Sequence, residues 1–324
     1  MTPTPAAEPC VHPELGFREF SRYEDVRAAL RQPALWPVAP LKPKPFRIPD
    51  QADQQELRAQ ILDRFSPPRM AAWQSRMAGI EVDVPARAPI DLVADFIEPW
   101  CLAAAGMVTE APPEDWNSLA AEARIISHAA AEPLDENLRV WATQSDNALA
   151  RYFAKSPFPM PGPTFVALSR TVACLLANGW AVLLDHPEER NKLQASPALL
   201  PKAVEEMLRL ASIPDMVFRH ASAAISVAGV PIAADERIIL RLAAANRDPL
   251  VFRDPNRFDP LRRGPAHLSL GFGLHACAGS ALIRMAMAAA TSVFLQRFGA
   301  LTLRGAIEWE GGSGFRTPRR LLVA

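Results

Sequence analysis

A cysteine bracketed by glycines and followed by a long alanine-rich segment is the feature that most restricts how this chain can fold. The stretch HLSLGFGLHACAGSALIRMAMAAA covers residues 267–290. Gly271 and Gly273 allow a tight backbone path up to Cys277, and Gly279 stands at the start of a predicted helix over 279–298. Cys277 is therefore expected at a helix N-terminus, where the helix dipole and free N–H groups favour the thiolate.

The local pattern around Cys277 leaves several interpretations open. A lone cysteine beside a helix is most often a small apolar filler of the core. A zinc site built from His267, His275 and Cys277 would lack a fourth ligand nearby in the sequence. A thiolate at a helix N-terminus can also be a nucleophile or a ligand to another metal.

Composition and charge exclude several classes of protein. With 324 residues and 49% hydrophobic side chains, the chain can bury a sizeable core in one large domain or two small ones. Its 35 basic residues balance 35 acidic ones, so no electrostatic footprint of a nucleic-acid binder is present. The four cysteines form no CxxC pair, which favours reduced thiols and a cytoplasmic location.

Neither a secretion signal nor a membrane span is expected. The N-terminal stretch MTPTPAAEPCVHPELG carries acids and prolines where a signal peptide needs basic residues and an apolar run. The longest apolar stretch, about 165–184, is interrupted by Arg170.

Hydrophobic periodicity predicts a mainly α protein with a small β component. A proline-rich loop is expected at 35–49, and short strands are expected after Ser222, with turns at Ala228-Gly229 and Ala233-Ala234, and again in the C-terminal tail. The helices are predicted at 54–65, 91–107, 114–130, 136–154, 164–184, 202–211 and 279–298.

The cysteine loop as a whole resembles a known signature. Residues 270–279, LGFGLHACAG, resemble the haem-binding loop of the cytochrome P-450 family, in which the cysteine is the proximal iron ligand. The resemblance implies that residues 1–324 form a single haem-thiolate domain, with Cys277 bound to haem b (iron protoporphyrin IX). It further implies a family fold that is shortened at the N-terminus and in the roof of the distal pocket.

Two further motifs extend the resemblance. Glu206-Met207-Leu208-Arg209 matches the family's ExxR motif, whose spacing places both charges on one helix face. After AANRDP at 244–249, the PNRF sequence supplies Arg257, which the resemblance assigns as the second arginine of a structural charge triad with Glu206 and Arg209.

The propionates of a partly buried haem need hydrogen-bond donors. The resemblance implies Arg58, Arg219 and His275 for this role, and Gln54 stands where many family members have a histidine. The predicted cofactor-binding set is completed by three loop residues, Leu270, Gly271 and Gly279.

The oxygen-activating helix is where the chain departs from the family. Family members usually show a small residue, a glycine, any residue, an acid and a threonine, whereas this chain has Ala167, Leu168, Ser169, Arg170 and Thr171. Arg170 and Thr171 are the candidate catalytic residues, although a guanidinium does not release protons in proteins. In a peroxygenase branch of the family, an arginine at the acid position binds a substrate carboxylate.

The resemblance implies oxidation of a small hydrophobic metabolite, with or without a carboxylate, in specialised metabolism. Monooxygenation would need a ferredoxin and a ferredoxin reductase, whereas a peroxide-driven reaction would need neither. Two alternatives stay open: a non-redox haem-thiolate enzyme for dehydration, rearrangement or cyclisation, and a catalytically silent scaffold. The distal pocket, expected to be unusually open because the 130–164 region is short, is predicted to be lined by Ala167, Leu168, Thr171, Ile213, Pro214, Met216 and Val217.

Overall fold

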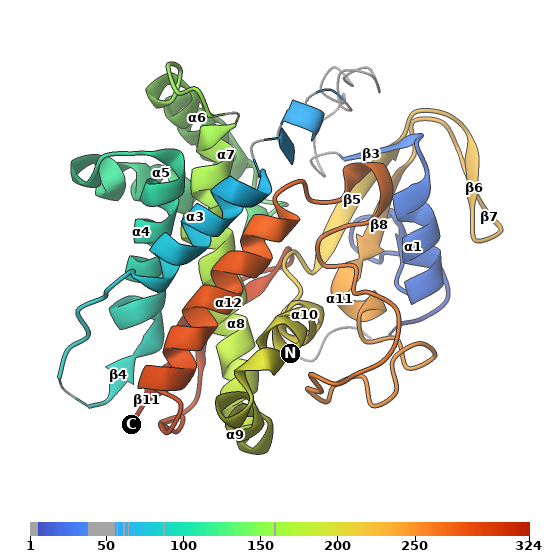
Figure 1. Cartoon of the computed structure of the whole chain (residues 1–324). Helices are drawn as coiled ribbons and strands as arrows, with labels where there is room; N and C mark the ends of the chain where they lie inside the picture. The colour runs from blue at the N-terminus through green and yellow to red at the C-terminus, as the bar shows by residue number, and fades with distance from the viewer. Residues whose placement is uncertain are drawn as a thin grey trace.

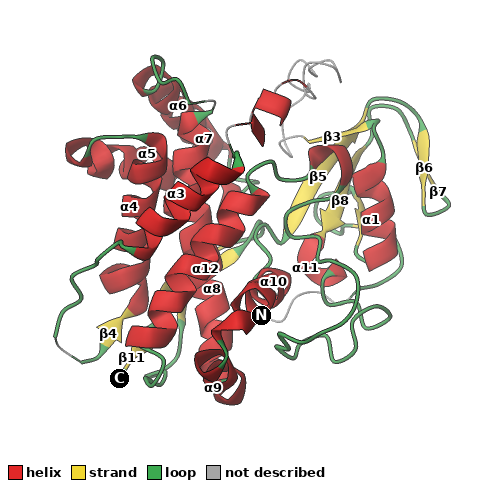
Figure 2. Ribbon diagram, in the orientation of Figure 1, coloured by secondary structure: helices red, strands yellow, loops and turns green. Residues whose placement is uncertain are grey.

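The computed structural model describes residues 6–37, 56, 58–60, 62–63, 65–86, 88–158 and 160–324. Figure 1 shows a large helical part beside a smaller part built around a sheet, and Figure 2 shows the strands concentrated in the smaller part. The α-helices are α1 (Tyr23–Arg31), α3 (Pro67–Ala78), α4 (Glu98–Thr109), α5 (Trp116–Ala131), α6 (Glu136–Tyr152), α7 (Pro161–Val166), α8 (Val172–Asp185), α9 (Pro187–Ala195), α10 (Leu200–Leu210), α11 (Leu242–Ala245) and α12 (Ser280–Arg297).

Short helical segments and strands complete the described chain. Two π-helical segments, η1 (Val93–Ile97) and η3 (Ala167–Thr171), precede α4 and α8, and 3-10 turns are formed by η2 (Pro113–Asp115), η4 (Pro197–Leu199) and η5 (Gly273–His275). The strands are β1 (Cys10–Val11), β2 (Arg18–Phe20), β3 (Leu35–Pro37), β4 (Ile90–Asp91), β5 (Met216–Ala221), β6 (Ile225–Val227), β7 (Val230–Ile232), β8 (Arg237–Arg241), β9 (Glu308–Gly311), β10 (Arg316–Arg320) and β11 (Leu322–Val323).

The centre of the helical part is the continuous helix made by α7, η3 and α8. Its side chains are mostly apolar and buried, and Trp180 stacks on Phe294 of α12 with ring centroids 4.5 Å apart. Gly179 faces α10 so closely that a Cβ there would lie 2.4 Å from Met207 Cε. By length and hydropathy alone this helix could cross a membrane, but 72% of its most apolar window is buried inside the protein, as in a core helix.

The smaller part is a five-stranded sheet in the order β1-β2-β8-β5-β3. Alternate residues of each strand point to opposite faces. On one face Ile238 and Leu240 of β8 pack with α1, whereas Ile239 packs on the other face with Met216 and Phe218 of β5. This alternation decides which residues of β5 can share a surface.

The predicted hairpin is confirmed. Strands β6 and β7 pair antiparallel, with Val227 opposite Val230. Ala228 and Gly229 connect them with φ of 52° and 79°, the left-handed conformation that a two-residue hairpin turn of type I′ requires.

Most predicted helices are present with shifted ends. The predicted helix at 164–184 corresponds to the continuous helix that begins at Pro161, and the predicted 202–211 helix is α10. In the short 130–164 region, α6 occupies 136–152 and packs against α5. Of the proline-rich loop, Leu35–Pro37 form strand β3, and 38–49 lie outside the described residues. Of the predicted 54–65 helix, residues 56, 58–60, 62–63 and 65 are described; all are helical except Phe65, which lies in a turn.

Candidate functional site

The loop before α12 holds Cys277 by backbone hydrogen bonds. Gly271 and Gly273 both have φ of +71°, which lets the chain turn back on itself. The Cys277 N–H donates to the Leu270 carbonyl at 2.7 Å, and the Ala276 N–H donates to the Gly273 carbonyl at 3.2 Å. Cys277 lies directly before α12, as the sequence predicts, with Gly279 capping that helix.

The loop is also pressed against α1. A Cβ on Gly273 would lie 2.8 Å from the Leu30 carbonyl oxygen, and the Arg31 guanidinium lies over the Phe272 ring, 4.8 Å from its centroid. The sheet part of the protein therefore forms one wall against which the cysteine loop rests.

We expect Gly273→Ala to lower the free energy of unfolding by about 2–3 kcal/mol, since it adds a steric clash with a backbone carbonyl to the cost of a left-handed side chain. Gly16 has a φ of +65°, and a Cβ at this position would meet nothing within 4 Å, so Gly16→Ala is a control that carries the backbone cost alone, about 1 kcal/mol. Urea unfolding of both variants measures the difference. Equal losses would show that the contact with α1 contributes nothing.

The thiol of Cys277 is subject to opposing electrostatic effects. Burial raises its pKa, while a hydrogen bond from the Gly279 backbone and the positive charges of Arg58 and Arg284 lower it. The net pKa is raised, because burial in apolar surroundings outweighs these groups.

Basic side chains gather beside this loop. Arg58 Nη1 donates to the Ala276 carbonyl at 2.6 Å. The Arg219 side chain is buried, donates to the Phe218 carbonyl at 2.9 Å, and has a pKa lowered to about 10 by desolvation. The structure thus brings both predicted arginines to the cysteine loop, whereas Gln54 lies outside the described residues.

His275 completes this basic cluster. Its ring packs edge-on against Trp36 with centroids 5.2 Å apart, and its Nε2 is buried without a hydrogen-bond partner among the described residues. Burial and the charge of Arg219 both lower the pKa of His275. The neutral imidazole therefore has one nitrogen that is still able to bond to a ligand.

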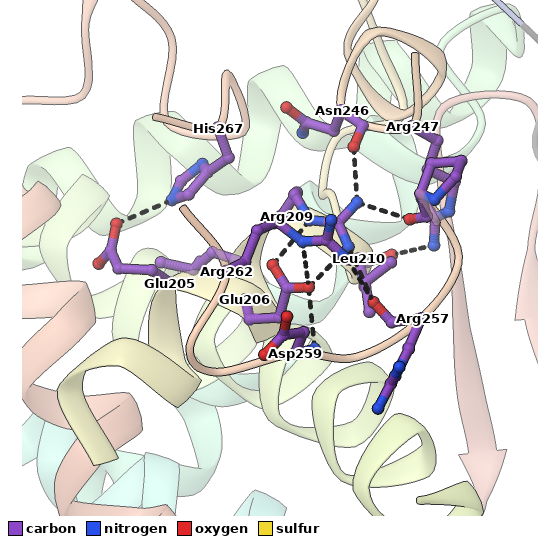
Figure 3. A network of polar contacts seen from close by, with 12 residues as sticks. Glu205, Glu206, Arg209, Leu210, Asn246, Arg247, Arg257, Asp259, Arg262 and His267 are labelled. Carbon is purple, nitrogen blue, oxygen red and sulfur yellow. Dashed lines mark hydrogen bonds and ion pairs between the residues drawn. The ribbon is translucent and has the colours of Figure 1, made fainter. Parts of the chain in front are cut away.

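The predicted contact between Glu206 and Arg209 is present and almost fully buried. Arg209 donates from Nε and Nη2 to the two Glu206 oxygens, both at 2.7 Å, and the Arg209 and Glu206 side chains are 2% and 5% exposed. The same guanidinium also donates to backbone carbonyls, among them that of Asn246 at 2.8 Å. Figure 3 shows this network.

The expectation that Arg257 supplies the second arginine is wrong. Arg262 takes that place, with its Nε 2.9 Å from Glu206 Oε1, while the Arg257 side chain is 63% exposed and lies 3.7 Å from Glu189. The turn that carries PNRF directs the Arg257 carbonyl inward, where it accepts from Arg209 at 3.2 Å, and so directs its side chain outward.

A known protein family has sequence similarity to the part of the chain that carries the charge network and the cysteine loop. A family model described as "Cytochrome P450" matches residues 183–308, which include α10, the buried charge network and the cysteine loop. Residues 183–308 thus resemble the cytochrome P450 family, and the chain as a whole has the cytochrome P450 fold. Members of this family bind haem b.

Curated P450 relatives match about half of this chain. The biotin biosynthesis cytochrome P450 of Bacillus subtilis is 42% identical over 160 residues, which are 49% of this chain and 40% of that protein. The 20-oxo-5-O-mycaminosyltylactone 23-monooxygenase of Streptomyces fradiae is 41% identical over 131 residues, 40% of this chain and 31% of that protein. The matched segments thus span less than half the length of these relatives.

Solved P450 structures match nearly the whole fold. P450BioI in complex with an acyl carrier protein ligated to hexadec-9Z-enoic acid has a TM-score of 0.80 at 25% identity, over 96% of this chain and 93% of that one. The LnmA hydroxylase of Streptomyces atroolivaceus, from the leinamycin biosynthetic pathway, has a TM-score of 0.78 at 26% identity, over 95% of this chain and 90% of that one.

Arg170, the atypical arginine predicted to be catalytic, forms an ion pair with Glu98. Arg170 Nη1 lies 2.5 Å from Glu98 Oε1 at the start of α4, and the Arg170 side chain is 10% exposed. Glu98 also pairs with Arg124 of α5 at 3.2 Å. Although burial by itself lowers the pKa of Arg170, the nearby Cys174 and the Glu98 carboxylate raise it above its ordinary value. Arg170 is thus a charged side chain that forms an ion pair with Glu98 of α4.

The two ends of this ion pair differ in burial, and we expect their substitutions to differ accordingly. Glu98→Gln leaves a buried guanidinium without a counter-charge and should cost about 3 kcal/mol of unfolding free energy. Arg170→Met leaves a carboxylate that retains Arg124 and water, so the loss should be about 1 kcal/mol. The double variant should resemble Arg170→Met alone in urea unfolding. Additive losses would contradict the assigned pairing.

Residues around Arg170 divide between the core and the partly exposed face. Ala167 and Thr171 are half-buried, whereas Leu168 is 1% exposed and packs in the helical core. The expectation that Leu168 lines the pocket with Ala167 is wrong, because Leu168 lies about 100° further around the helix and packs in the core. The face that remains for a ligand carries Ala167 and Thr171.

The segment 213–217 also does not line one surface as predicted. Ile213 packs in the helical core, Met216 packs on one face of the sheet, and Val217 packs on the other face. Pro214 is half-buried. Because adjacent strand residues point to opposite faces, Met216 and Val217 cannot both face the pocket.

Sequence reasoning did not find Arg262, Glu98 or Trp36. Arg262 belongs to the basic pair in DPLRR, shortly after PNRF. A second basic residue near this motif could therefore have been recognised as a candidate partner of Glu206. Glu98 and Arg170 are separated by 72 residues, and no local pattern links them.

Proposed function

We propose that this chain is a haem-thiolate oxidoreductase of the cytochrome P450 type, with residues 1–324 as one domain and Cys277 as the residue that would hold the iron. The observation that carries the proposal is a cysteine at the start of α12 beside three basic groups, Arg58, Arg219 and His275, that have no carboxylate partner among the described residues. Two arginines and an imidazole suit the two propionates of haem.

The residues around Cys277 fit this group. Every residue of 270–280 keeps part of its surface exposed, although most are apolar, while 267–269 just before them are buried. Arg219 has no acidic side chain within ion-pair distance in the described part of the chain, and burial of such a cation is costly unless an anion binds it. An apolar surface with unpaired cations at one edge is what an amphipathic porphyrin requires.

When bound, a haem with a thiolate ligand supplies the redox-active iron for oxidation of organic substrates. In this chain, Cys277 would hold the iron, and Arg58, Arg219 and His275 would hold the propionates. Leu270, Gly271 and Gly279 shape the loop around the sulfur. On the other side, Ala167 and Thr171 would face the substrate, with Thr171 as the hydroxyl that can hold a proton or a water there.

We further propose a small hydrophobic metabolite of specialised metabolism as the substrate. The half-buried face of Ala167 and Thr171 carries little polarity, which supports an apolar ligand. Electrons would come from a ferredoxin and a ferredoxin reductase, and the reaction would take place in the cytoplasm. Hydroxylation of the substrate with electrons from these two proteins is the monooxygenase version of the activity.

The ion pair of Arg170 argues against the peroxide-driven reaction. That version requires its guanidinium to bind a substrate carboxylate, but the guanidinium is already engaged by Glu98. A non-redox reaction is a second candidate function, because 167–171 contain no acid beside Thr171 to deliver protons.

Turnover of candidate substrates under three conditions distinguishes these versions. We expect product with a ferredoxin, its reductase and NADPH, and little product with hydrogen peroxide or with no oxidant. Product formed equally without any oxidant or reductant would replace the proposal by the non-redox candidate. Product formed only with peroxide, and only from carboxylates, would require Arg170 to leave Glu98.

A further inference from the structure

Glu205 stands next to Glu206 on α10 but joins a different set of side chains. Its two carboxylate oxygens accept from Arg284 Nε at 2.5 Å and Nη2 at 3.1 Å, a two-point contact with α12. The same carboxylate lies 3.3 Å from Nε2 of His267, whose side chain is 3% exposed. Figure 3 shows these two side chains facing each other.

His267 is held in one orientation toward Glu205. The Ser269 N–H donates to His267 Nδ1 at 3.2 Å, so Nδ1 is the acceptor and Nε2 carries the proton that faces the carboxylate. Burial by itself raises the pKa of Glu205, but His267 and Arg284 lower it to about 2. Glu205 is therefore a carboxylate at any pH near neutrality.

The two partners of Glu205 flank the cysteine in the chain. His267 opens the stretch that leads to Cys277, and Arg284 lies in the first turns of the helix that follows it. Between them, no residue of 270–280 is buried, and Leu270, Phe272 and Cys277 pack only partly buried against the core clusters. One carboxylate on α10 thus connects both ends of the cysteine loop.

We propose that Glu205 is a positioning residue for Cys277: it ties His267 and Arg284 to α10 and thereby fixes where the loop presents its sulfur. The effect of Glu205 on metal binding by Cys277 rests on the proposed function. The restraint that Glu205 places on the loop does not depend on that function. Groups that orient a metal-binding side chain from outside the ligand set typically change metal affinity about tenfold or more when removed.

Glu205→Gln tests this role, because glutamine keeps the size of the side chain and loses its charge. Glu308→Gln is the matched control, since Glu308 forms a similarly exposed ion pair with Arg320 at 3.3 Å on the terminal hairpin. Arg284→Lys retains the charge but loses the two-point contact, so its effect should lie between those of wild type and Glu205→Gln.

Two measurements are made on each full-length protein. In the haem-bound form, we expect the thiolate-type carbon monoxide band to decay about tenfold faster in Glu205→Gln than in wild type or Glu308→Gln. Hydrogen–deuterium exchange of peptides within 268–283 should also be faster in Glu205→Gln, while exchange in α8 stays unchanged.

The outcomes separate this inference from the proposed function. If wild type shows no thiolate-type band, the proposed function fails, and the exchange measurement still decides whether Glu205 restrains the loop. Unchanged band decay and unchanged loop exchange in Glu205→Gln would overturn the inference. Equal acceleration in Glu308→Gln, or exchange that rises uniformly across the protein, would show general destabilisation and overturn it as well.

Discussion

Replacement of Cys277 by serine is expected to abolish the carbon monoxide difference band of thiolate-ligated ferrous haem. Serine is nearly isosteric, and the backbone hydrogen bond from residue 277 to the Leu270 carbonyl does not depend on the side chain. The loop should therefore keep its path while the sulfur ligand is lost. The measurement is the reduced difference spectrum of purified Cys277→Ser, compared with wild type at equal protein concentration.

The other cysteines supply controls for this substitution. Cys10 is exposed, and Cys101 and Cys174 are buried between helices. Cys10→Ser should leave the band unchanged. Persistence of the band in Cys277→Ser, or its loss in Cys10→Ser, would show that another residue binds the iron.

Glu206→Gln is expected to cause the largest loss of stability, about 3–5 kcal/mol of unfolding free energy. Glu206 neutralises both Arg209 and Arg262 in a buried position, and its carboxylate also accepts from the Asp259 N–H at 3.1 Å. Removal of its charge leaves two buried guanidinium groups without a counter-ion. Denaturant unfolding measures the loss, and aggregation on expression would be its extreme form.

Arg257→Ala tests the corrected composition of this network. Because the Arg257 side chain is 63% exposed, its removal should cost less than about 0.5 kcal/mol. Arg262→Ala should cost several times more, since the Arg262 side chain is 12% exposed and pairs with Glu206. Equal losses for the two arginines would contradict the network as described.

The local sequence was sufficient to predict those structural features that depend on residues close together in the chain. The glycines before Cys277, the helix after it, the Glu206–Arg209 spacing and the Ala228-Gly229 turn all act within a few residues. Their geometry follows from backbone conformation and helical periodicity, so it survives whatever tertiary context surrounds them.

Contacts between distant segments could not be predicted in the same way. The partner of Arg170 is Glu98 on another helix, which turns an apparent pocket arginine into a link between α4 and η3. Met216 and Val217 are adjacent in the sequence, which suggests one shared surface, yet a strand sends adjacent residues to opposite faces. In each case the side-chain direction was decided by packing that the sequence does not display.

The proposed binding of haem iron by Cys277 is tested most directly on the wild-type protein itself, reconstituted with haem, reduced and exposed to carbon monoxide. We expect one haem per chain and a difference band of the thiolate-ligated type. A protein that takes up no haem, or whose band is that of haem with a nitrogen ligand, would contradict it.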